Sequence, residues 1–516
     1  MTHWIIAPVA LPALVAALMI TLLRGRLALQ RIVSLAAILA LNAIALALMW
    51  SATTHGPEAY HLGNWPAPYG IVLVLDRLSA LMVALLAALA LICTLYAIGS
   101  GWDRKGAHFH PLLMFLLMGI GGAFLTGDAF NLFVFFEVLL IASYGLMIHG
   151  GGSARTRAGI QYIAFNLIGS SLFLIALALL YGVTGTLNMA DLAVKLPSLP
   201  EGDRALLRVA AVMLILVFAI KGALVPMQFW LPGTYANAPG VVAALFAVMT
   251  KIGAYATLRF GSLVFPPDLP ATGPLLQNLI QPAALVTLAV GAIGVLGAST
   301  LLRLAAFGGI ASMGTVFLAI SAFTPATTAA ALYYILHSTL ATAALFLVCD
   351  LVARRRAHVR LTEPAALAGQ SGLIAALYMA AAVALAGLPP LSGFIGKLLV
   401  LQAFRDQAPL VWTAVLVSSF LMILGLARAG SQLFWKPASD PGASPPPGGE
   451  GSGVGGNSTV APGPEPLAFA ATFTLVAGLA ALTLLAGPIT DWLTVTAESL
   501  YAPEAYIAAN RLGVAP

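Results

Sequence analysis

Four ionisable side chains lie deep inside long apolar stretches of the sequence, and residues of these types could carry protons. They are Glu137, Lys221, Lys251 and Lys397. A charge at the centre of a bilayer costs about 2.5 to 3.5 kcal/mol on insertion scales unless it is paired or hydrated. Residues kept at that cost typically mark an ion or proton route through a membrane. Lysine suits such a route because its pKa shifts readily with its surroundings, whereas arginine stays charged.

The chemistry of a carboxylate beside a buried lysine follows from electrostatics. Burial disfavours the charged lysine and a nearby carboxylate favours it, so a change of charge on the carboxylate moves the proton. If Glu137 lies close to Lys221, the pair can hold a proton in one state and release it towards Lys251 in another. The alternative is a static buried ion pair that fixes the register of two helices. Lys251 and Lys397 have no obvious partner nearby in the sequence, which favours a functional role for both.

Three further acidic residues have plainer interpretations. Asp350 lies near the end of an apolar stretch, close to Arg354, which favours an interfacial anchor, with proton uptake as the alternative. Asp76 and Arg77 are adjacent at the start of an apolar stretch and could form a surface pair. Asp128 falls in a short turn, where it would be solvated or would cap the next helix.

The elements that must position these residues are membrane-spanning helices. Sixty per cent of the residues are apolar and only 8% are charged. Apolar stretches of about 18 residues or more recur along the chain, which is typical of an all-α polytopic membrane protein. The first stretch lacks a basic segment before it and a cleavage site after it, so we expect a span and not a signal peptide. About fourteen spans are expected, near residues 4–23, 32–50, 71–97, 111–126, 129–149, 159–182, 207–226, 239–259, 279–300, 304–323, 328–352, 372–403, 410–434 and 467–487.

Two interruptions rich in proline and glycine fall at matching places in two blocks of five helices. LVPMQFWLPGTYANAPG breaks the seventh span and LAGLPPLSGFIG breaks the twelfth, each the fourth helix of its block, 111–260 and 279–435. Because five is odd, the blocks would begin on opposite sides of the membrane and form inverted repeats. Broken helices at matching places in inverted repeats indicate a transport site near the midplane. Lys221 and Lys397 each lie within a few residues of a break.

Basic residues predict the orientation. Fourteen of the 24 Lys and Arg residues fall in loops and flanks on one side of the expected spans, and six on the other. The richer side is therefore expected in the cytoplasm, with both termini outside. Besides the two repeats, we expect a three-helix region at 1–110 and a disordered cytoplasmic linker, rich in Pro, Gly and Ser, at 436–466. A last transmembrane helix with an interfacial C-terminal tail is expected at 467–516.

Several function classes are disfavoured by the sequence. Its net charge of +6 is scattered over short loops, which does not favour nucleic-acid binding. Cys93 and Cys349 lie in separate apolar stretches and support neither a disulfide framework nor a metal site. GSGVGG in the linker follows no strand, so it is not interpreted as a phosphate-binding loop. Without a cysteine cluster, haem motif or dinucleotide fingerprint, we expect no cofactor and no redox chemistry in this chain.

Six segments of the sequence carry a resemblance to a known family: GAFLTGDAFNLFVFFEVLLIASYGL, YGVTGTLNMADL, FAIKGALVPMQFWLPGTYANAP, MTKIGAYATLR, LHSTLATAALFLVCDL and GLPPLSGFIGKLLVLQAF. Together they resemble the antiporter-like subunits of Mrp-type monovalent cation/proton antiporters, most closely those of the D type. The resemblance covers all the expected spans. The same helical core occurs in the proton-pumping membrane-arm subunits of respiratory complex I and in related membrane-bound hydrogenases, and a pump of that kind is the main alternative.

The resemblance implies roles for residues at matching positions. Glu137 and Lys221 would be the carboxylate–lysine pair of a first half-channel, and Lys251 the central relay. His337 would be the histidine of the eleventh span and Lys397 the terminal lysine of the second half-channel. The implied protein is no enzyme but a subunit of a secondary transporter in the bacterial cell (inner) membrane, exchanging protons for Na⁺ or another monovalent cation. Its implied partners are a larger antiporter-like paralogue and several small membrane subunits.

The sequence departs from the wider family near His337. Many complex I relatives carry an additional basic residue one turn after this histidine, whereas this chain has Ala341. The difference favours a component of an antiporter over a complex I pump. His337 has a structural interpretation too, because polar residues often form hydrogen bonds between membrane helices. A scaffold that anchors partners without transport is a third class of function.

Overall fold

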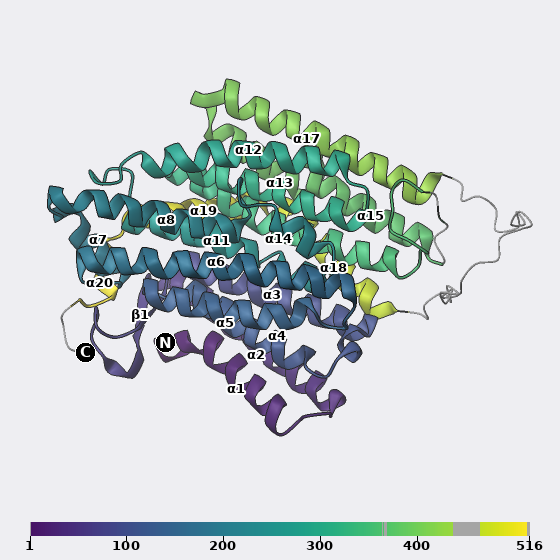
Figure 1. Cartoon of the computed structure of the whole chain (residues 1–516), viewed down its shortest axis with the longest axis horizontal. Coiled ribbons are helices and arrows are strands. Elements are labelled where there is room, and N and C mark those ends of the chain that lie inside the picture. The colour runs from purple at the N-terminus through teal and green to yellow at the C-terminus, as the bar shows by residue number, and fades with distance from the viewer. Residues whose placement is uncertain (1, 364, 366–368, 437–464, 513–516) are drawn as a thin grey trace, which may run out of the picture.

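The structure is a computed structural model that describes residues 2–363, 365, 369–436 and 465–512. Its long helices lie side by side in one elongated bundle (Figure 1). The first and the last described elements lie towards the same end of the bundle (Figure 1). The elements are α1 (Ala7–Thr21), α2 (Leu27–Thr54), β1 (Glu58–His61), β2 (Val72–Leu75), α3 (Arg77–Ser100), α4 (Phe109–Leu125), α5 (Ala129–Met147), α6 (Ser153–Thr184), α7 (Met189–Lys195), α8 (Arg204–Gly222), α9 (Trp230–Tyr235), α10 (Gly240–Phe246), α11 (Met249–Arg259), α12 (Leu275–Gly297), α13 (Leu301–Ser321), α14 (Pro325–Ala353), α15 (Ser371–Ala386), α16 (Ser392–Ala403), α17 (Ala408–Gly430), α18 (Pro466–Leu484), α19 (Ala486–Leu500) and α20 (Glu504–Ala509).

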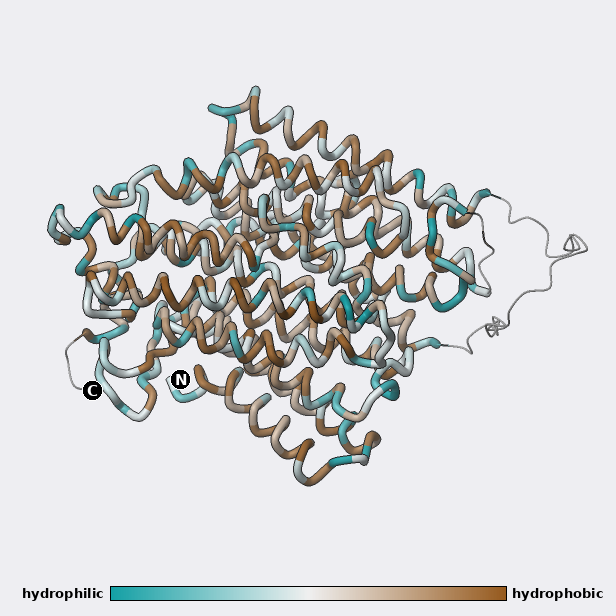
Figure 2. Tube along the Cα trace, in the orientation of Figure 1, coloured by the Kyte–Doolittle hydropathy of each residue, from teal (hydrophilic) through white to brown (hydrophobic). Residues whose placement is uncertain are grey.

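The helices have the length and composition of membrane spans. Within the described residues, 12 helical runs are long and apolar enough to cross a bilayer, and α4, α15 and α16 are shorter apolar helices beside them. Hydrophobic residues follow the helices through the bundle, and hydrophilic residues gather towards its two ends (Figure 2). The chain is therefore a multi-pass helical membrane protein, as its composition predicts.

A short β-hairpin precedes α3. The all-α fold expected from the sequence does not include these strands. Strands β1 and β2 pair antiparallel. The apolar residues 71–75, expected to begin the third span, mostly form the buried strand β2. The helix begins only at Arg77 because Asp76 caps it. The Asp76 carboxylate accepts the Ser79 N–H at 2.8 Å, and the Ser79 hydroxyl accepts the Asp76 N–H at 2.8 Å. The expected start of this span near residue 71 is therefore wrong.

The first predicted interruption is present between α8 and α11. Helix α8 ends at Gly222, and Ala223 takes a left-handed conformation with a φ of 55°. The short helices α9 and α10 follow before α11 begins. The backbones of α8 and α11 touch, because a Cβ atom on Gly253 would lie only 2.6 Å from the Gly222 nitrogen. Glycine at position 253 thus brings the helix of Lys251 against the helix of Lys221.

The second predicted interruption separates α15 from α16. Helix α15 ends at Ala386, and Gly387 has a φ of 82°, a left-handed conformation that glycine adopts without steric cost. Helix α16 begins at Ser392 and carries Lys397. The helix ends created by this break lie beside Lys397, because a Cβ atom on Gly387 would be 2.6 Å from the Lys397 Cδ.

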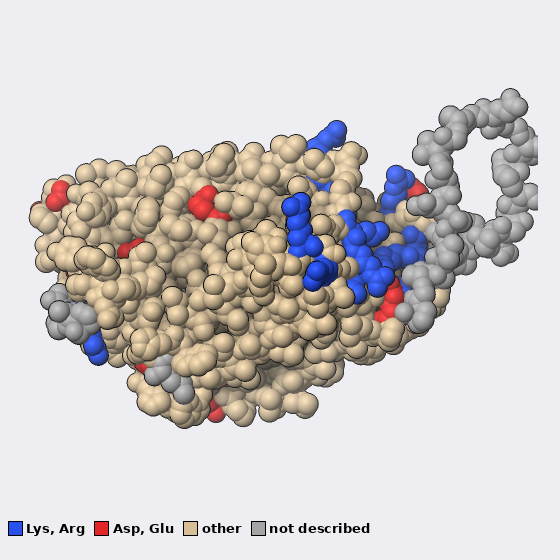
Figure 3. All heavy atoms as spheres, turned by 90° about the horizontal axis from the view of Figure 1, so that it is seen from below, with Lys and Arg blue, Asp and Glu red and all other residues tan. Residues whose placement is uncertain are grey.

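Basic side chains gather at one end of the bundle, which we call the basic end. Figure 3 shows Lys and Arg concentrated towards this end of the molecule on the face in view. The loops that carry them contact one another: Arg354 donates to the Ser100 carbonyl at 2.7 Å, and the Arg155 guanidinium lies 5.4 Å from the Trp102 ring centre. The basic end comprises Arg31, Arg104, Lys105, Arg155, Arg354, Arg355 and Arg356, and it includes most of the tract RRRAHVR.

A buried carboxylate fixes the first helices at the basic end. Asp103 accepts hydrogen bonds from Arg31 Nε at 2.6 Å and Nη2 at 2.8 Å, and it lies 3.3 Å from His110 Nε2. Burial raises the pKa of Asp103, but the hydrogen bonds from His110 and Arg31 outweigh burial and hold this pKa at about 2. The ionised carboxylate thus ties α2 and α4 to the turn Trp102–Lys105.

The C-terminal helices return to the end of the bundle opposite the basic end. The Tyr501 hydroxyl after α19 lies 2.8 Å from the Thr328 hydroxyl of α14, and the Trp492 indole donates to the Thr53 hydroxyl at 3.2 Å. The expected interfacial tail therefore packs against the bundle in this structure. The expected linker at 436–466 lies almost wholly outside the described residues.

Candidate functional site

Glu137 and Lys221 project from α5 and α8, and α6 links them. The Ser170 hydroxyl on α6 donates to the Glu137 carboxylate, and the Lys221 ammonium donates to Asn166 Oδ1 at 3.1 Å. Because Asn166 and Ser170 are four residues apart, they share one face of α6. Within the part of the chain that the structure describes, no ion pair of 4.0 Å or less joins Glu137 directly to Lys221. The sequence-predicted pair is therefore brought together through α6.

Lys221 is buried, with 7% of its surface exposed, whereas Glu137 is half-buried. The ammonium lies 5.5 Å from the centre of the Phe136 ring, an arrangement in which the ring face favours the cation. A cavity of about 10 Å³ adjoins Lys221, Asn166 and Ser170. That is close to the space one water centre needs. The cavity therefore leaves room for about one water molecule beside Lys221 and the polar face of α6.

Lys251 on α11 is more deeply buried, with 1% exposure. Its ammonium contacts the Met313 sulfur on α13 at 3.3 Å. A thioether is a weak hydrogen-bond acceptor. Among the described residues no carboxylate forms an ion pair with Lys251. The Lys251 ammonium therefore has a weaker hydrogen-bond acceptor than the Lys221 ammonium, which donates to an amide oxygen.

His337 on α14 connects to the second helix break. Its Nδ1 lies 2.9 Å from the Ser392 hydroxyl at the start of α16, and the imidazole is fully buried. Its Nε2 has no hydrogen-bond partner among the described residues. Gly393 makes this approach possible, because a Cβ atom there would lie 2.0 Å from the Ala384 carbonyl and 2.9 Å from His337 Cε1. His337 is therefore held by α16 on one side and has an unused ring nitrogen on the other.

Lys397 lies at the carboxyl end of α15. Its ammonium donates to the Ala386 carbonyl at 2.7 Å and to the Ser419 hydroxyl on α17 at 2.8 Å. The last carbonyls of a helix lack partners within the helix and carry partial negative charge, so they favour a cation. A largely apolar cavity of about 260 Å³ between α15, α16 and α17 reaches Lys397. The break thus supplies an oxygen acceptor for Lys397, which forms no ion pair with a carboxylate of the described residues.

Two other predicted groups lie elsewhere in the fold. The Asp76 carboxylate is buried and pairs with Arg259 Nη1 at 2.7 Å, so the expected surface pair with Arg77 is wrong. The sequence gives no sign of this pairing, because the two residues are far apart along the chain. Asp128 caps α5 by accepting the Asn131 N–H at 2.7 Å, which confirms one of its two interpretations, and burial raises its pKa to about 6.

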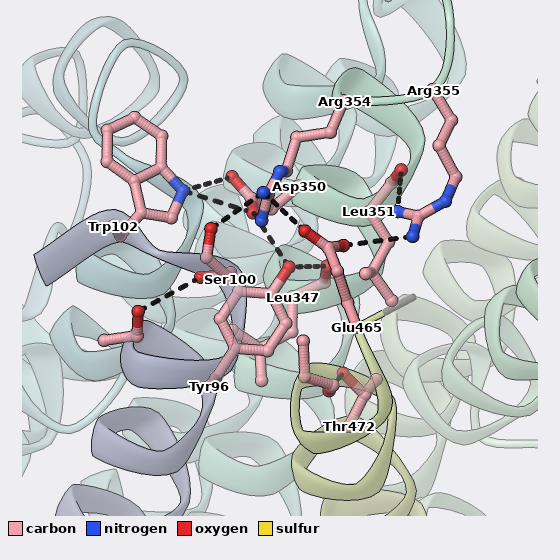
Figure 4. Close-up of polar contacts among 12 residues, drawn as sticks. Tyr96, Ser100, Trp102, Leu347, Asp350, Leu351, Arg354, Arg355, Glu465 and Thr472 are labelled. Carbon is pink, nitrogen blue, oxygen red and sulfur yellow. Dashed lines mark hydrogen bonds and ion pairs between the residues drawn. The ribbon is translucent and has the colours of Figure 1, made fainter. Parts of the chain in front are cut away.

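Asp350 lies at the basic end of α14, away from the other predicted residues. Figure 4 shows its carboxylate next to Tyr96, Trp102 and Arg354, with Glu465 beyond Arg354. Its side chain is buried and lies 3.9 Å from Arg354, so the expected neighbour is present.

Sequence reasoning missed the neutral partners of the buried charges. Asn166, Ser170, Ser392 and Ser419 hydrogen-bond Lys221, Glu137, His337 and Lys397 respectively. Serine and asparagine occur often in membrane helices, so their presence alone is a weak signal. The spacing of Asn166 and Ser170 by one helical turn could have indicated a polar face on α6.

The buried acid, the lysines and the broken helices define a class of membrane proteins that move ions. Residues 126–423 match the family described as NADH:quinone oxidoreductase/Mrp antiporter, transmembrane. The match covers more than half of the chain, and the chain belongs to this family.

The similar proteins include components of antiporters. A probable K⁺/H⁺ antiporter D subunit from Rhizobium meliloti (strain 1021) is 38% identical, covering 99% of this chain and 98% of the relative. An Na⁺/H⁺ antiporter D subunit from Bacillus subtilis (strain 168) is 37% identical, covering 99% of both chains. A chain in the structure of the Mrp complex from Dietzia sp. DQ12-45-1b superposes with a TM-score of 0.86 at 29% identity, covering 99% of this chain and 100% of that chain.

Proposed function

We propose that this chain is the proton-translocating subunit of a multi-subunit antiporter that exchanges protons for Na⁺ or another monovalent cation. The observation that carries the proposal is the series of buried ionisable side chains, each provided with a neutral partner and two of them beside helix breaks. Full-length similarity to antiporter subunits from two bacteria supports it. One of those relatives is named for K⁺ and the other for Na⁺, so both cations are included in the test.

The proton route runs along the middle of the bundle. A proton held between Glu137 and Lys221 passes to Lys251 when the charge on Glu137 is compensated by a cation or by a second proton. From Lys251 it continues by His337 to Lys397. Each step reverses without a covalent intermediate, so the chain acts as part of a secondary transporter and not as an enzyme.

The proposed topology follows the charge distribution. The 12 long apolar helices, α4, and the interrupted pair α15–α16 make fourteen crossings, with residues 111–260 and 279–435 as inverted repeats. The basic end faces the cytoplasm and both termini lie outside. The chain resides in the bacterial cell membrane, where its partners are a larger antiporter-like paralogue and small membrane subunits. Similarity to a chain of a multi-subunit Mrp complex supports this arrangement.

A proton pump driven by a redox complex fits less well. The family also includes NADH:quinone oxidoreductase subunits, but two relatives that are 38% and 37% identical over 99% of this chain are named as D-type antiporter subunits. Ala341, fully buried one turn after His337, leaves the second half of the route without a further basic group at that position.

The test measures proton movement in inverted membrane vesicles that contain the whole complex. A pH-sensitive dye reports how a preformed proton gradient changes when Na⁺, K⁺ or Li⁺ is added. Glu137→Ala and Lys221→Ala should each abolish the cation-induced change while the complex still assembles. The matched controls are Glu201→Ala and Lys195→Ala, which remove the same side-chain types from exposed positions and should retain the activity. Full activity in both pathway variants would contradict the proposal and favour a scaffold.

A further inference from the structure

Asp350 is a buried carboxyl group for which the proposed route has no use. The Tyr96 hydroxyl of α3 donates to its Oδ2 at 2.8 Å, and the Trp102 indole N–H lies 3.1 Å from Oδ1 and 3.3 Å from Oδ2. Figure 4 shows these donors converging on the carboxylate from one side and Arg354 approaching from the other. Only 5% of Asp350 is exposed. An anchor at the bilayer surface would point its carboxylate to water, whereas this one is enclosed by hydrogen-bond donors.

Arg354 is shared unequally between two carboxylates. Its Nη2 lies 2.5 Å from Glu465 Oε1 and also donates to the Ser100 carbonyl at 2.7 Å. Its Nη1 lies 3.9 Å from Asp350 Oδ2, beyond hydrogen-bond distance, and has no hydrogen-bond partner within the described residues although it is buried. A buried guanidinium N–H without a partner is unfavourable. A small movement would therefore let Arg354 close on Asp350.

The charges around Asp350 come from every side of the cluster. Tyr96 faces it from α3, Arg354 from its own helix, and Glu465 from the start of α18. Arg155 on α6 is close enough to interact electrostatically, and Arg355 holds Glu465 at 3.0 Å. The cluster therefore balances two carboxylates against three arginines, and a proton on Asp350 changes that balance.

Helix α14 connects Asp350 with the proposed proton route. His337 precedes Asp350 by thirteen residues, which is about 20 Å along the helix axis. Between them, the Thr342 hydroxyl is buried without a protein partner in the described part of the chain, and His337 Nε2 also lacks a hydrogen-bond partner there. Buried polar atoms of this kind offer binding positions to water. Polar atoms are thus available in the direction from the cluster to His337.

We propose that Asp350 is the protonation site at which the route exchanges protons with the solution at the basic end, with Arg354 as its adjustable counter-charge. This inference rests on the proposed function. A proton arrives from water on an Asp350 oxygen and leaves from the same carboxyl to water beside α14, so the group is regenerated in each cycle. With the proton on Asp350, Arg354 remains on Glu465; without it, Arg354 Nη1 closes on Asp350 Oδ2.

The test compares the pH profiles of cation-dependent proton movement in vesicles carrying the whole complex. Asp350→Asn keeps the size of the side chain but cannot be ionised, and it should lower the initial rate at least tenfold. Tyr96→Phe removes a hydrogen bond that favours the ionised carboxylate, so the profile should move to higher pH. Glu465→Gln removes a negative neighbour and frees Arg354, so the profile should move to lower pH. Each displacement should be roughly half a unit to one unit.

If Asp350 were only a structural anchor, these substitutions would lower the amount of assembled complex without moving the pH profile. Opposite displacements of the profile in Tyr96→Phe and Glu465→Gln therefore indicate proton exchange. The control is Asp491→Asn, an equivalent change at an exposed position of α19, which should keep both rate and profile. Co-purification of the partner subunits checks assembly, and if Asp350→Asn fails to assemble, Tyr96→Phe and Glu465→Gln still decide the outcome. Unmoved profiles in both variants would overturn the inference, as would a normal rate in an assembled Asp350→Asn complex. Normal rates in Glu137→Ala and Lys221→Ala would instead overturn the proposed function.

Discussion

Replacement of Ser170 by alanine tests whether the Glu137 carboxylate is tuned by α6. The Ser170 hydroxyl donates to the Glu137 carboxyl group, and alanine removes this donor without adding volume. A hydrogen bond to a charged group contributes about 1.5 to 3 kcal/mol. Because Glu137 is only half-buried, the lower limit applies. A loss of ~1.5 kcal/mol corresponds to about tenfold tighter proton binding, or about one pH unit.

We therefore expect the pH of half-maximal antiport in Ser170→Ala to rise by about one unit, with a normal amount of assembled complex. The assay is the dye-reported rate after addition of Na⁺ to inverted vesicles, measured over a series of pH values. Ser171→Ala is the matched control, because the neighbouring hydroxyl is exposed and bonds only within its own helix, to the Leu167 carbonyl at 3.0 Å. Identical profiles for the two variants would refute the reasoning, since the contact from α6 would then have no effect on proton binding.

Two further predictions concern packing and charge. Gly393→Ala should greatly reduce antiport, because the added methyl group overlaps a backbone carbonyl of α15 and presses on His337; Gly372→Ala, where a Cβ atom meets nothing within 4 Å, should keep wild-type rates in the same vesicle assay. Asp103→Asn should lower the free energy of unfolding by roughly 2 kcal/mol, because it leaves the partly buried Arg31 guanidinium without its carboxylate partner. Since the pKa of Asp103 is about 2, below its unfolded value of 3.8, the ion pair stabilises the wild type above about pH 4 and is lost as the pH falls towards 2. Thermal unfolding of the purified complex over a pH series measures this, and equal stability of Asp103→Asn at neutral pH would contradict it.

The sequence was sufficient to predict the elements that hydropathy controls. Burial of Lys221 and Lys397 and the breaks beside them follow from apolar stretches interrupted by proline and glycine, which act locally. The pairing of Asp76 with Arg259 depends on contact between α11 and the start of α3, which no local pattern encodes. Strand β2 resembled the start of a span because a short apolar run does not distinguish a strand from a helix.

The partners of the buried charges could be predicted least. A lysine or glutamate in an apolar helix stands out because its desolvation is costly, so its functional role can be inferred from the residue type. Ser170 and Asn166 carry no charge, and their importance arises only from the distances to Glu137 and Lys221. Their identification therefore required the packing of α5, α6 and α8, which depends on contacts between helices distant in sequence.

The contact between Lys397 and the last carbonyl of α15 constrains how this protein can be redesigned or can evolve. The Ala386 carbonyl can accept a hydrogen bond from Lys397 because the helix ends at this residue, and Gly387 leaves space for the lysine side chain. A lysine introduced at the same depth into an uninterrupted helix would find every backbone oxygen already engaged. The break and the lysine therefore depend on each other, and we expect that they must be kept, lost or transferred to another transporter together.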